Sequence, residues 1–328
     1  MSALPVTGAG IVLPTDDRFV ASAAACRAIV RERAANFYWG LRLTPEPRRS
    51  ALYAVYAWMR AGDDAVDDPG SDEERRTKLD RFECATRATL WGEGQIERDD
   101  SREPWWCSFA WAVETFGIER RVLEGMMSGL RSDLYHPDPS VELAHADDDA
   151  LDGYCALVGS TVGEACVTVW GLAPSIGNSS REEALRLSRL RGIAFQRTNI
   201  LRDFAEDLRG GGGVPPRVYL PRSTFDAHGL IPEQLASWSK PEACRALIVD
   251  QARRAAEAYR ASAGLESMIS PDCRAVLRAM TAIYRGVLGR IERDPRRVAA
   301  ERVRLSTWRK AVIAVRCGLA PRLGLAPA

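Results

Sequence analysis

Residues 51–68 read ALYAVYAWMRAGDDAVDD, an apolar run that ends in four aspartates. We expect a helix here, with one stripe of polar and aromatic side chains at spacings of 3, 4, 3 and 4 residues, formed by Tyr53, Tyr56, Arg60, Asp63 and Asp67. An ordinary core helix would place leucine or isoleucine along such a stripe. Because buried carboxylates are costly without cations or metals, this stretch predicts an ionic site inside a helical core.

Residues 195–208, FQRTNILRDFAEDL, repeat this design. A second helical stripe, at spacings of 3, 4 and 4 residues, has Arg202 beside it and consists of Gln196, Asn199, Asp203 and Asp207. Two facing helices of this kind would form an acidic cavity. Mg²⁺ prefers oxygen ligands and usually bridges to phosphate oxygens, and the donors of arginine match the same oxygens. The two stripes therefore predict a diphosphate-binding enzyme.

Acidic residues at helical spacing also occur on solvated faces, and we keep that interpretation for the runs at 72–74 and 147–149. Either aspartate cluster alone would fit a solvated face about as well as a metal site. The two clusters together, with Asn199 in register and an arginine close to each, favour the metal site.

The bulk composition excludes several classes of protein. The 328 residues are 46% hydrophobic and 27% charged, as in soluble globular proteins, and the net charge of +1 argues against nucleic acid as a partner. We find no apolar run long enough to cross a bilayer and no signal peptide, so we expect a cytoplasmic protein. The eight cysteines form no C-x-x-C pair and are expected to be reduced, and the three isolated histidines argue against zinc chemistry.

Alanine, leucine, arginine and glutamate dominate the chain, which predicts an all-α fold. The expected helices cover residues 18–44, 48–67, 72–91, 104–116, 119–133, 147–155, 160–170, 180–208, 232–238, 241–263, 271–293 and 298–317. No dinucleotide fingerprint, P-loop, solenoid repeat or linker is found. We therefore expect residues 1–328 to form one helical domain, with an irregular segment at 1–17 and a basic amphipathic segment at 296–328.

Five segments of the chain, in order, resemble the squalene/phytoene synthase family. They are FYWGLRL at 37–43, the aspartate stretch at 51–67, YCALVGSTVG at 154–163, QRTNILRDFAED at 196–207 and RVYLP at 217–221, with RVRLS at 302–306 closing the resemblance. The resemblance covers most of the chain.

The resemblance implies the all-α isoprenoid synthase fold, in which a single helical bundle surrounds a central active-site cavity. It also implies a prenyltransferase that joins two identical prenyl diphosphates head to head and releases diphosphate. Two or three Mg²⁺ ions per site would be held by Asp63, Asp67, Asn199, Asp203 and Asp207. The residues implied to act in catalysis are Tyr154, Arg60, Arg202 and Tyr219. Substrate contacts are expected from Asn36, Phe37, Tyr56, Arg60, Gln196, Asn199, Arg202, Arg217, Tyr219 and Tyr284.

The substrate and the reductant stay open at this level. Farnesyl diphosphate is expected first, giving presqualene diphosphate or squalene, and the alternative is geranylgeranyl diphosphate, giving phytoene. No residue decides between them, because chain length depends on the depth of the cavity. No nicotinamide fingerprint is present, so the use of NADPH is uncertain.

Two other classes of protein also fit parts of the sequence. Two intact aspartate motifs argue against a non-catalytic family member. Head-to-tail prenyltransferases and terpene cyclases share the fold, but the segments at 199–203 and 217–221 favour the head-to-head group.

The segment from 296 to 322 is basic, with apolar residues interleaved. It is expected either to contact an anionic membrane surface or to close the bundle as an ordinary amphipathic helix. Peripheral contact with the inner membrane face therefore stays open. The oligomeric state, monomer or dimer, is also not decided by the sequence.

Several smaller features also have two interpretations. Small residues at 159–165 would leave room for a prenyl chain or permit close helix packing. The glycines at 210–213 would form a mobile lid or a plain loop. Arg197 would contact phosphate or form a surface salt bridge, and Phe195 is expected to pack in the core.

Overall fold

The computed structural model describes residues 10–93, 103–140, 142–177, 180–211 and 214–319, apart from the side chains of 35–37. Every regular element in these ranges is helical, in the order α1 (Asp17–Arg33), α2 (Ala35–Leu41), α3 (Arg48–Asp67), α4 (Asp72–Trp91), α5 (Trp106–Phe116), α6 (Arg120–Leu134), α7 (Asp148–Cys155), η2 (Ala156–Ser160), α8 (Thr161–Trp170), α9 (Arg181–Arg209), α10 (Arg222–His228), α11 (Pro232–Ala236), α12 (Pro241–Ala261), α13 (Leu265–Met268), α14 (Arg274–Arg293), α15 (Arg297–Ala300) and α16 (Thr307–Leu319). Strand-like pairing in the same ranges is confined to two isolated bridges, Leu172–Ile269 and Gly211–Val214. The predicted all-α fold is confirmed.

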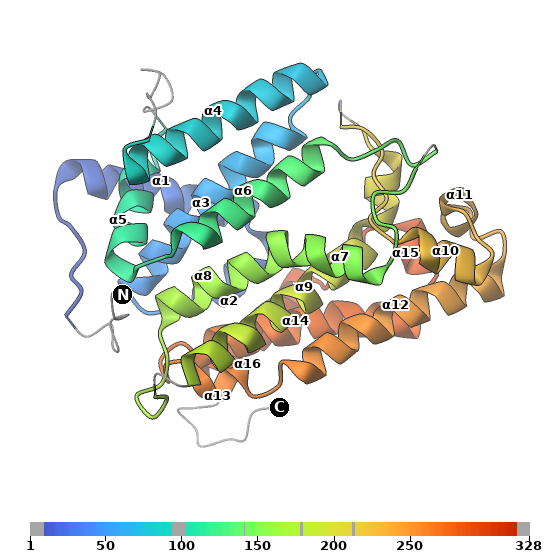
Figure 1. The fold of residues 1–328 in the computed structure, drawn as a ribbon. Coiled ribbons are helices and arrows are strands. Elements are labelled where there is room, and N and C mark those ends of the chain that lie inside the picture. Colours follow the sequence, from blue (N-terminus) through green and yellow to red (C-terminus); the bar gives the residue numbers. More distant parts are fainter. Residues whose placement is uncertain (1–9, 94–102, 141, 178–179, 212–213, 320–328) are drawn as a thin grey trace.

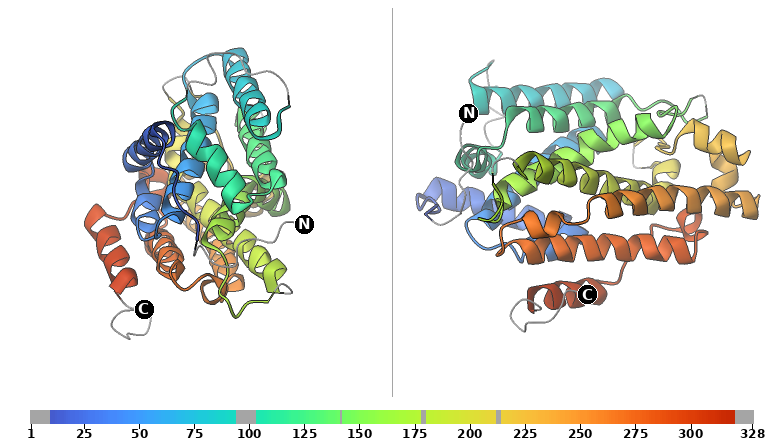
Figure 2. Two further views of the ribbon diagram at one scale, coloured as in Figure 1. Left: turned by 90° about the vertical axis from the view of Figure 1, so that its left-hand side faces the viewer. Right: turned by 60° about the horizontal axis from the view of Figure 1, so that its bottom comes forward.

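The helices form two groups joined by a central layer (Figure 1). α1, α4 and α5 pack around α3, whereas α12 and α14 pack on the long helix α9. The segment α7–η2–α8 lies between the groups, where η2 and α8 contact both α6 and α9. α16 lies on the outside of the second group, against α14 and α2 (Figure 2).

Two large apolar cores support the helices, and the first also includes residues of α9 and α14, such as Leu187 and Leu277. In the first core, the rings of Trp58 and Phe109 stack with centroids 4.9 Å apart, and both side chains are fully buried. The second core contains Leu201, Ile248 and Ile291 from α9, α12 and α14. The polar stripes of α3 and α9 face the space between these cores, so the fold brings them to one site.

Local sequence sets several helix ends. Ser71 accepts a hydrogen bond from the backbone N–H of Glu74, whose side chain accepts one from Ser71 N in return, which completes a capping box at the start of α4. Gly92 ends the same helix at φ 68°, a conformation that glycine adopts without steric cost. The predicted start of a helix at 147–149 corresponds to Asp147, which caps α7 by accepting from Ala150 N at 2.9 Å.

The helices differ from the prediction in several places. The expected helix at 18–44 is divided at Ala34 into α1 and α2, and the short helices α10 and α13 were not predicted. The expected helix at 298–317 is broken by an extended segment between α15 and α16. There Val303 N donates to Arg202 O at 3.2 Å, and Val303 and Leu305 are buried, so contacts with α9 replace helical hydrogen bonds.

The segment α7–η2–α8 contains a π-helical turn at Ala156–Ser160. Its Gly159 lies directly against Gly192 of α9: a Cβ on Gly192 would lie 2.4 Å from Gly159 O. Gly163 meets Ser188 O in the same way, since a Cβ there would lie 2.8 Å from that oxygen. The small residues of this segment therefore permit close packing of helices, and that packing brings η2 and α8 to the central cavity.

Candidate active site

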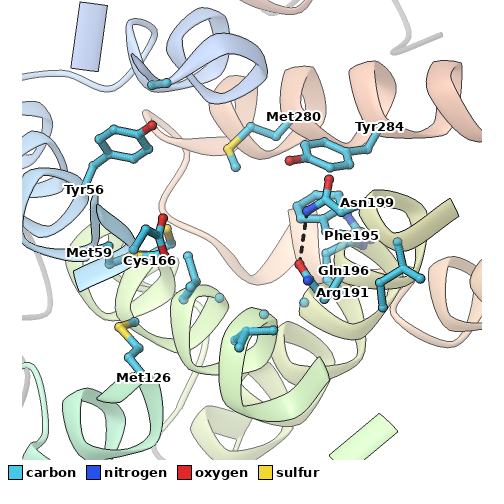
Figure 3. Close-up of a pocket in the computed structure, with 18 of the residues that line it drawn as sticks. Tyr56, Met59, Met126, Cys166, Arg191, Phe195, Gln196, Asn199, Met280 and Tyr284 are labelled. Carbon is cyan, nitrogen blue, oxygen red and sulfur yellow. Dashed lines mark hydrogen bonds between the residues drawn. The ribbon is translucent and has the colours of Figure 1, made fainter. Parts of the chain in front are cut away.

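A cavity of about 500 Å³ lies between the two groups of helices (Figure 3). It follows α9 from Ser188 to Asp207, about 28 Å along the helix at 1.5 Å per residue. Its acidic end is lined by Asp63, Asp67, Asp203 and Asp207. Its other end is mostly apolar and is lined by Trp58, Met59, Met126, Cys166, Trp170, Leu277 and Met280. One cavity therefore offers a charged region and an apolar one.

Four of the five stripe residues of α3 line the cavity: Tyr56, Arg60, Asp63 and Asp67. Tyr53 does not, because its side chain is buried in the core of the first helix group. Asp63 keeps 44% of its side-chain surface accessible, and its nearest arginine contact is Arg60 Nη1 at 3.7 Å from Oδ2. The inner carboxylates of α3 therefore point into the cavity.

Asp64 binds the arginines beside this cluster. Its Oδ1 accepts from Arg60 Nε at 2.8 Å and from Arg33 Nη2 at 2.9 Å. Because Arg60 and Arg33 both bind Asp64, Asp63 has only the longer 3.7 Å contact with Arg60. The arginine expected to bind phosphate, Arg60, still lines the cavity.

On α9 the predicted stripe also lines the cavity, from Gln196 through Asn199 and Asp203 to Asp207. Asn199 Nδ2 donates to Gln196 Oε1 at 3.1 Å, as Figure 3 shows. Asn199 Oδ1 is buried and has no hydrogen-bond partner among the described residues. A buried acceptor of this kind is costly unless a cation or donor satisfies it.

Arg217 connects the two aspartate clusters through an ion pair to one and a backbone hydrogen bond to the other. Arg217 Nη1 lies 2.9 Å from Asp67 Oδ1, and the backbone N–H of Arg217 donates to Asp207 O at 2.8 Å. The segment after α9 therefore folds back across the cavity to α3. Arg217 is buried and stands between the carboxylates of both helices.

Arg302 is a site residue that the sequence analysis did not single out. Its Nε lies 2.8 Å from Asp203 Oδ1, where Arg202 Nε also donates at 2.8 Å. Arg302 Nη1 is 3.0 Å from Glu206, and the residue lines the cavity. The only signal in the sequence was its place in the basic segment RVRLS.

Burial and neighbouring carboxylates raise the pKa of two aspartates that line the cavity. Burial is the main cause that raises the pKa of Asp63 to about 7, with Arg60 opposing the rise and Asp67 and Asp133 contributing to it. Burial and Asp203 raise the pKa of Asp207 to about 8, against Arg217 and Arg202. Both side chains therefore hold their protons more strongly than free aspartates, which is what carboxylates do when they lack sufficient positive charge nearby.

The donor set fits a hard divalent cation. Among the described residues, no three His, Cys, Asp or Glu side chains gather closely enough to form a complete metal cluster. Mg²⁺ does not need one, because it usually keeps several waters and binds one or two carboxylates plus substrate phosphates. Asp63 with Asp67, and Asp203 with Asp207 and the unsatisfied Asn199 Oδ1, provide such partial oxygen sets.

Two tyrosines share one carboxylate beside this site. Asp133 of α6 accepts from Tyr154 OH at 2.9 Å and from Tyr219 OH at 3.0 Å. The two rings stack with centroids 5.2 Å apart. Burial raises the pKa of Asp133 to about 6, whereas Arg217 and the two hydroxyls lower it. Burial also raises the pKa of both tyrosines well above the ordinary value, so they remain hydrogen-bond donors.

Asp133 was missed because nothing in its local sequence marks it. It belongs to no acidic cluster and is the last residue of the helix predicted at 119–133. Its role in the site depends on two tyrosines that lie 21 and 86 residues away in the chain.

Aromatic and apolar side chains line the rest of the cavity. Phe195 stacks on Tyr284 with ring centroids 4.5 Å apart, and both line the cavity. Phe195 also packs on both cores, so the expected packing role is accompanied by a place at the site. Figure 3 labels Met59, Cys166 and Met280 among the residues that line the cavity.

Three residues that the sequence predicted to contact substrate are not placed at the cavity by the structure. The side chains of Asn36 and Phe37 lie outside the described part of the structure. Arg197 is buried and donates to Asp152 at 2.7 Å and Asp148 at 3.0 Å, so it makes neither the phosphate contact nor the surface salt bridge expected. Residues 212 and 213 of the glycine run lie outside the described ranges.

Solved structures share this fold. A dehydrosqualene synthase superposes with a TM-score of 0.73 at 21% identity, covering 92% of this chain and 97% of that one. Squalene synthase HpnC from Alicyclobacillus acidocaldarius superposes with a TM-score of 0.68 at 22% identity, covering 83% and 93%. At this identity the two structures bear on the fold alone, which is the all-α isoprenoid synthase fold.

Sequence relatives are more informative about the family. A phytoene synthase of Mycobacterium tuberculosis is 33% identical over 290 residues, covering 88% of this chain and 87% of that protein. Phytoene synthase 2 of Solanum lycopersicum is 30% identical over 268 residues, covering 81% and 80%. The squalene/phytoene synthase family matches residues 30–309. The chain therefore belongs to the squalene/phytoene synthase family of prenyltransferases, which join prenyl diphosphates head to head.

Proposed function

We propose that this family member condenses two molecules of geranylgeranyl diphosphate head to head, in the presence of Mg²⁺, to give one phytoene, two diphosphates and a proton. One observation carries the proposal: the Arg217–Asp67 ion pair brings both aspartate clusters to one end of a largely apolar cavity. A prenyl diphosphate has the same two parts, a charged head and an apolar chain.

The preference for geranylgeranyl diphosphate comes from sequence relatives. Relatives near 30% identity over more than four fifths of the chain are phytoene synthases, from a mycobacterium and from tomato. The expectation of farnesyl diphosphate rested on no residue, so it becomes the second substrate to test.

The acidic end would bind the diphosphates. Asp63, Asp67, Asn199, Asp203 and Asp207 would hold Mg²⁺, which when bound screens the carboxylates and stabilises negative charge on the departing diphosphate. Arg60, Arg202, Arg217 and Arg302 line the same end and would bind phosphate oxygens. The ion pairs that these arginines make with aspartates would be exchanged for contacts with the substrate.

The apolar end would protect the carbon skeleton. Breaking the C1–O bond leaves an allylic cation, which must be kept from water until it bonds to the second prenyl chain. Tyr56, Phe195 and Tyr284 line the cavity and offer aromatic faces that stabilise a cation. The departed diphosphate would accept the proton lost when the new carbon skeleton forms.

Asp133 would position Tyr154 and Tyr219. Its carboxylate accepts a hydrogen bond from each hydroxyl, so the two stacked rings are held in the cavity lining near Arg217 and Asp207. We assign the two tyrosines to substrate contact and Asp133 to holding them in place.

One incubation tests the proposal. Purified protein with Mg²⁺ is given labelled geranylgeranyl or farnesyl diphosphate, with and without NADPH, and the products are analysed. We expect a C40 hydrocarbon from geranylgeranyl diphosphate without NADPH. A C30 product from farnesyl diphosphate alone would move the protein to the second substrate, and the absence of both products would overturn the proposal.

A further inference from the structure

Helix α16 exposes a continuous apolar stripe. Four large apolar residues at spacings of 4, 3 and 4 lie on one face of the helix: Trp308, Val312, Val315 and Leu319. Their exposed fractions are 66%, 39%, 56% and 44%. The other large hydrophobic residues that are exposed in the described ranges lie singly on other segments, such as Val20 on α1 and Val249 on α12. Single exposed residues are ordinary, but an aligned set marks an interaction surface.

The opposite face of α16 is packed, which holds the stripe outward. Ala314 is buried, and Ile313 packs on the second core. A Cβ on Gly318 would lie 3.3 Å from Leu43 Cδ2, so this end of the helix fits closely against the segment after α2. Figure 2 shows α16 on the outside of the bundle, beside α14.

The helix is also basic. It contains Arg309, Lys310 and Arg316 and no acidic residue. Arg309 and Arg316 are exposed, and at 100° per residue they lie together about a quarter turn from the stripe. Among the described residues, none of these three cations has an ion-pair partner within 4.0 Å. Lys310 is partly buried, and burial lowers its pKa.

An apolar face with arginines along one edge and a tryptophan near its end is typical of helices that lie in a membrane interface. A second copy of the chain fits less well, because a two-fold contact would bring the same basic helices together without acidic partners. A membrane span is excluded for the described part of the chain, in which no helix is long and apolar enough.

We propose that the exposed face of α16 docks the protein on a membrane surface that contains anionic lipids. α14, on which α16 packs, lines the cavity with Leu277, Met280 and Tyr284. The docked membrane would therefore lie one helix away from the prenyl-binding cavity. The proposal needs only the surface of α16 and is independent of which prenyl chain the cavity takes.

The test is vesicle flotation of the full chain. One set of vesicles contains phosphatidylcholine alone, and the other contains equal parts of phosphatidylcholine and phosphatidylglycerol. We expect binding to the anionic vesicles that weakens as salt is raised and is much lower on the neutral ones. The Trp308→Ser/Val315→Ser variant should bind the anionic vesicles at least about tenfold more weakly than the wild type, since it removes two apolar anchors.

A matched control uses two exposed residues elsewhere. The Ile231→Ser/Val249→Ser variant changes side chains of 53% and 46% exposure outside α16 and should bind like the wild type. The Arg309→Gln/Arg316→Gln variant should lose the preference for anionic vesicles. Turnover in detergent should be the same in all these variants, which separates docking from catalysis.

Three outcomes would overturn the proposal. The first is that the wild type does not float with anionic vesicles. The second is that the Trp308→Ser/Val315→Ser variant floats as well as the wild type. The third is that sedimentation shows this variant converting a dimer to a monomer while vesicle binding is unchanged, which would assign the stripe to a second copy.

Discussion

At the scale of single residues, two adjacent aspartates at the acidic end of the cavity have different arginine contacts. Asp64 accepts from Arg33 and Arg60, whereas Asp63 has only a 3.7 Å contact with Arg60. Asp63 and Asp64 are adjacent aspartates. The sequence alone distinguishes them only by position, because Asp63 lies on the polar stripe of α3 and Asp64 does not. The structure adds the physical reason: Asp63 lines the cavity, whereas Asp64 is not part of that lining and is held by Arg33 and Arg60.

We predict different consequences for these two neighbours. Asp63→Asn should reduce kcat by at least about a hundredfold, because a ligand for the charge-stabilising metal is lost. Asp64→Asn should reduce kcat by about tenfold or less, since Arg60 and Arg33 remain near the cavity. Steady-state turnover at several Mg²⁺ concentrations measures both, and circular dichroism checks folding. Equal losses in the two variants would contradict the assignment.

Asp133 provides a second residue-scale prediction. Its ionised form accepts the hydrogen bonds of both tyrosines more strongly than its neutral form does, and its pKa is raised to about 6. At saturating Mg²⁺, kcat should therefore fall as the pH drops through about 6. Asp133→Asn should lower kcat by about tenfold to a hundredfold and abolish this acidic limb.

Tyr219→Phe is the control for this prediction. It removes one of the two hydrogen bonds to Asp133 and keeps the carboxylate, so its pH profile should retain the acidic limb. An acidic limb that survives in Asp133→Asn would show that another group causes it.

At the scale of elements, the contact between η2 and α9 decides the geometry of the cavity. Gly159 and Gly192 meet backbone to backbone, and each also lines the cavity. The sequence left two interpretations of these small residues, and the close approach of two helices explains them. A π-helical turn at this contact shifts the register of the helix between Tyr154 and α8.

We predict that Gly192→Ala destabilises the protein. The added Cβ would lie 2.4 Å from Gly159 O, and because backbone cannot yield easily, the free energy of unfolding should fall by about 1–3 kcal/mol. Gly289→Ala in α14 is the matched control. A Cβ there meets nothing within 4 Å, so this variant should gain about 0.5–1 kcal/mol from helix propensity.

Urea unfolding of both variants measures these changes. A Gly192→Ala variant as stable as the wild type would show that η2 and α9 separate without cost. Opposite signs for the change in the free energy of unfolding in the two variants would support the close contact directly.

At the scale of the whole molecule, the fold concentrates carboxylates from α3, α6 and α9 around one cavity. Burial, and after it their mutual repulsion, raises the pKa of Asp63 to about 7 and of Asp207 to about 8. The unfolded chain exposes these groups to water, where their pKa is near 3.8. The folded protein therefore binds more protons than the unfolded chain between about pH 4 and pH 8.

This difference predicts how stability depends on pH and on Mg²⁺. Without Mg²⁺, Tm should fall as the pH rises from 6 to 8.5, because the buried carboxylates lose their protons in the folded state. Mg²⁺ binds the ionised carboxylates, so its stabilising effect should be larger at pH 8.5 than at pH 6.

Thermal unfolding with Mg²⁺ or with EDTA at the two pH values measures this effect. In the Asp63→Asn/Asp207→Asn variant, both the pH dependence without metal and the difference between the two Mg²⁺ effects should shrink. The same gain in Tm from Mg²⁺ at both pH values would contradict the prediction.

Most of the fold and the core of the site were predictable from local patterns. Helical periodicity places Arg60, Asp63 and Asp67 on one face whatever the fold, and the same holds for Asn199, Asp203 and Asp207. Exceptions occurred where tertiary contacts compete with local preference. The chain after α15 is extended because Val303 bonds to Arg202 O.

The sequence by itself determined the helical fold, the two carboxylate stripes and the family, because each is written in spacings of a few residues. Only the tertiary structure decided that Arg217 links the two stripes, that Asp133 unites Tyr154 with Tyr219, and that Arg302 reaches Asp203. These partners come from segments far apart in the chain. Their meeting depends on how whole helices pack, and no local periodicity records that.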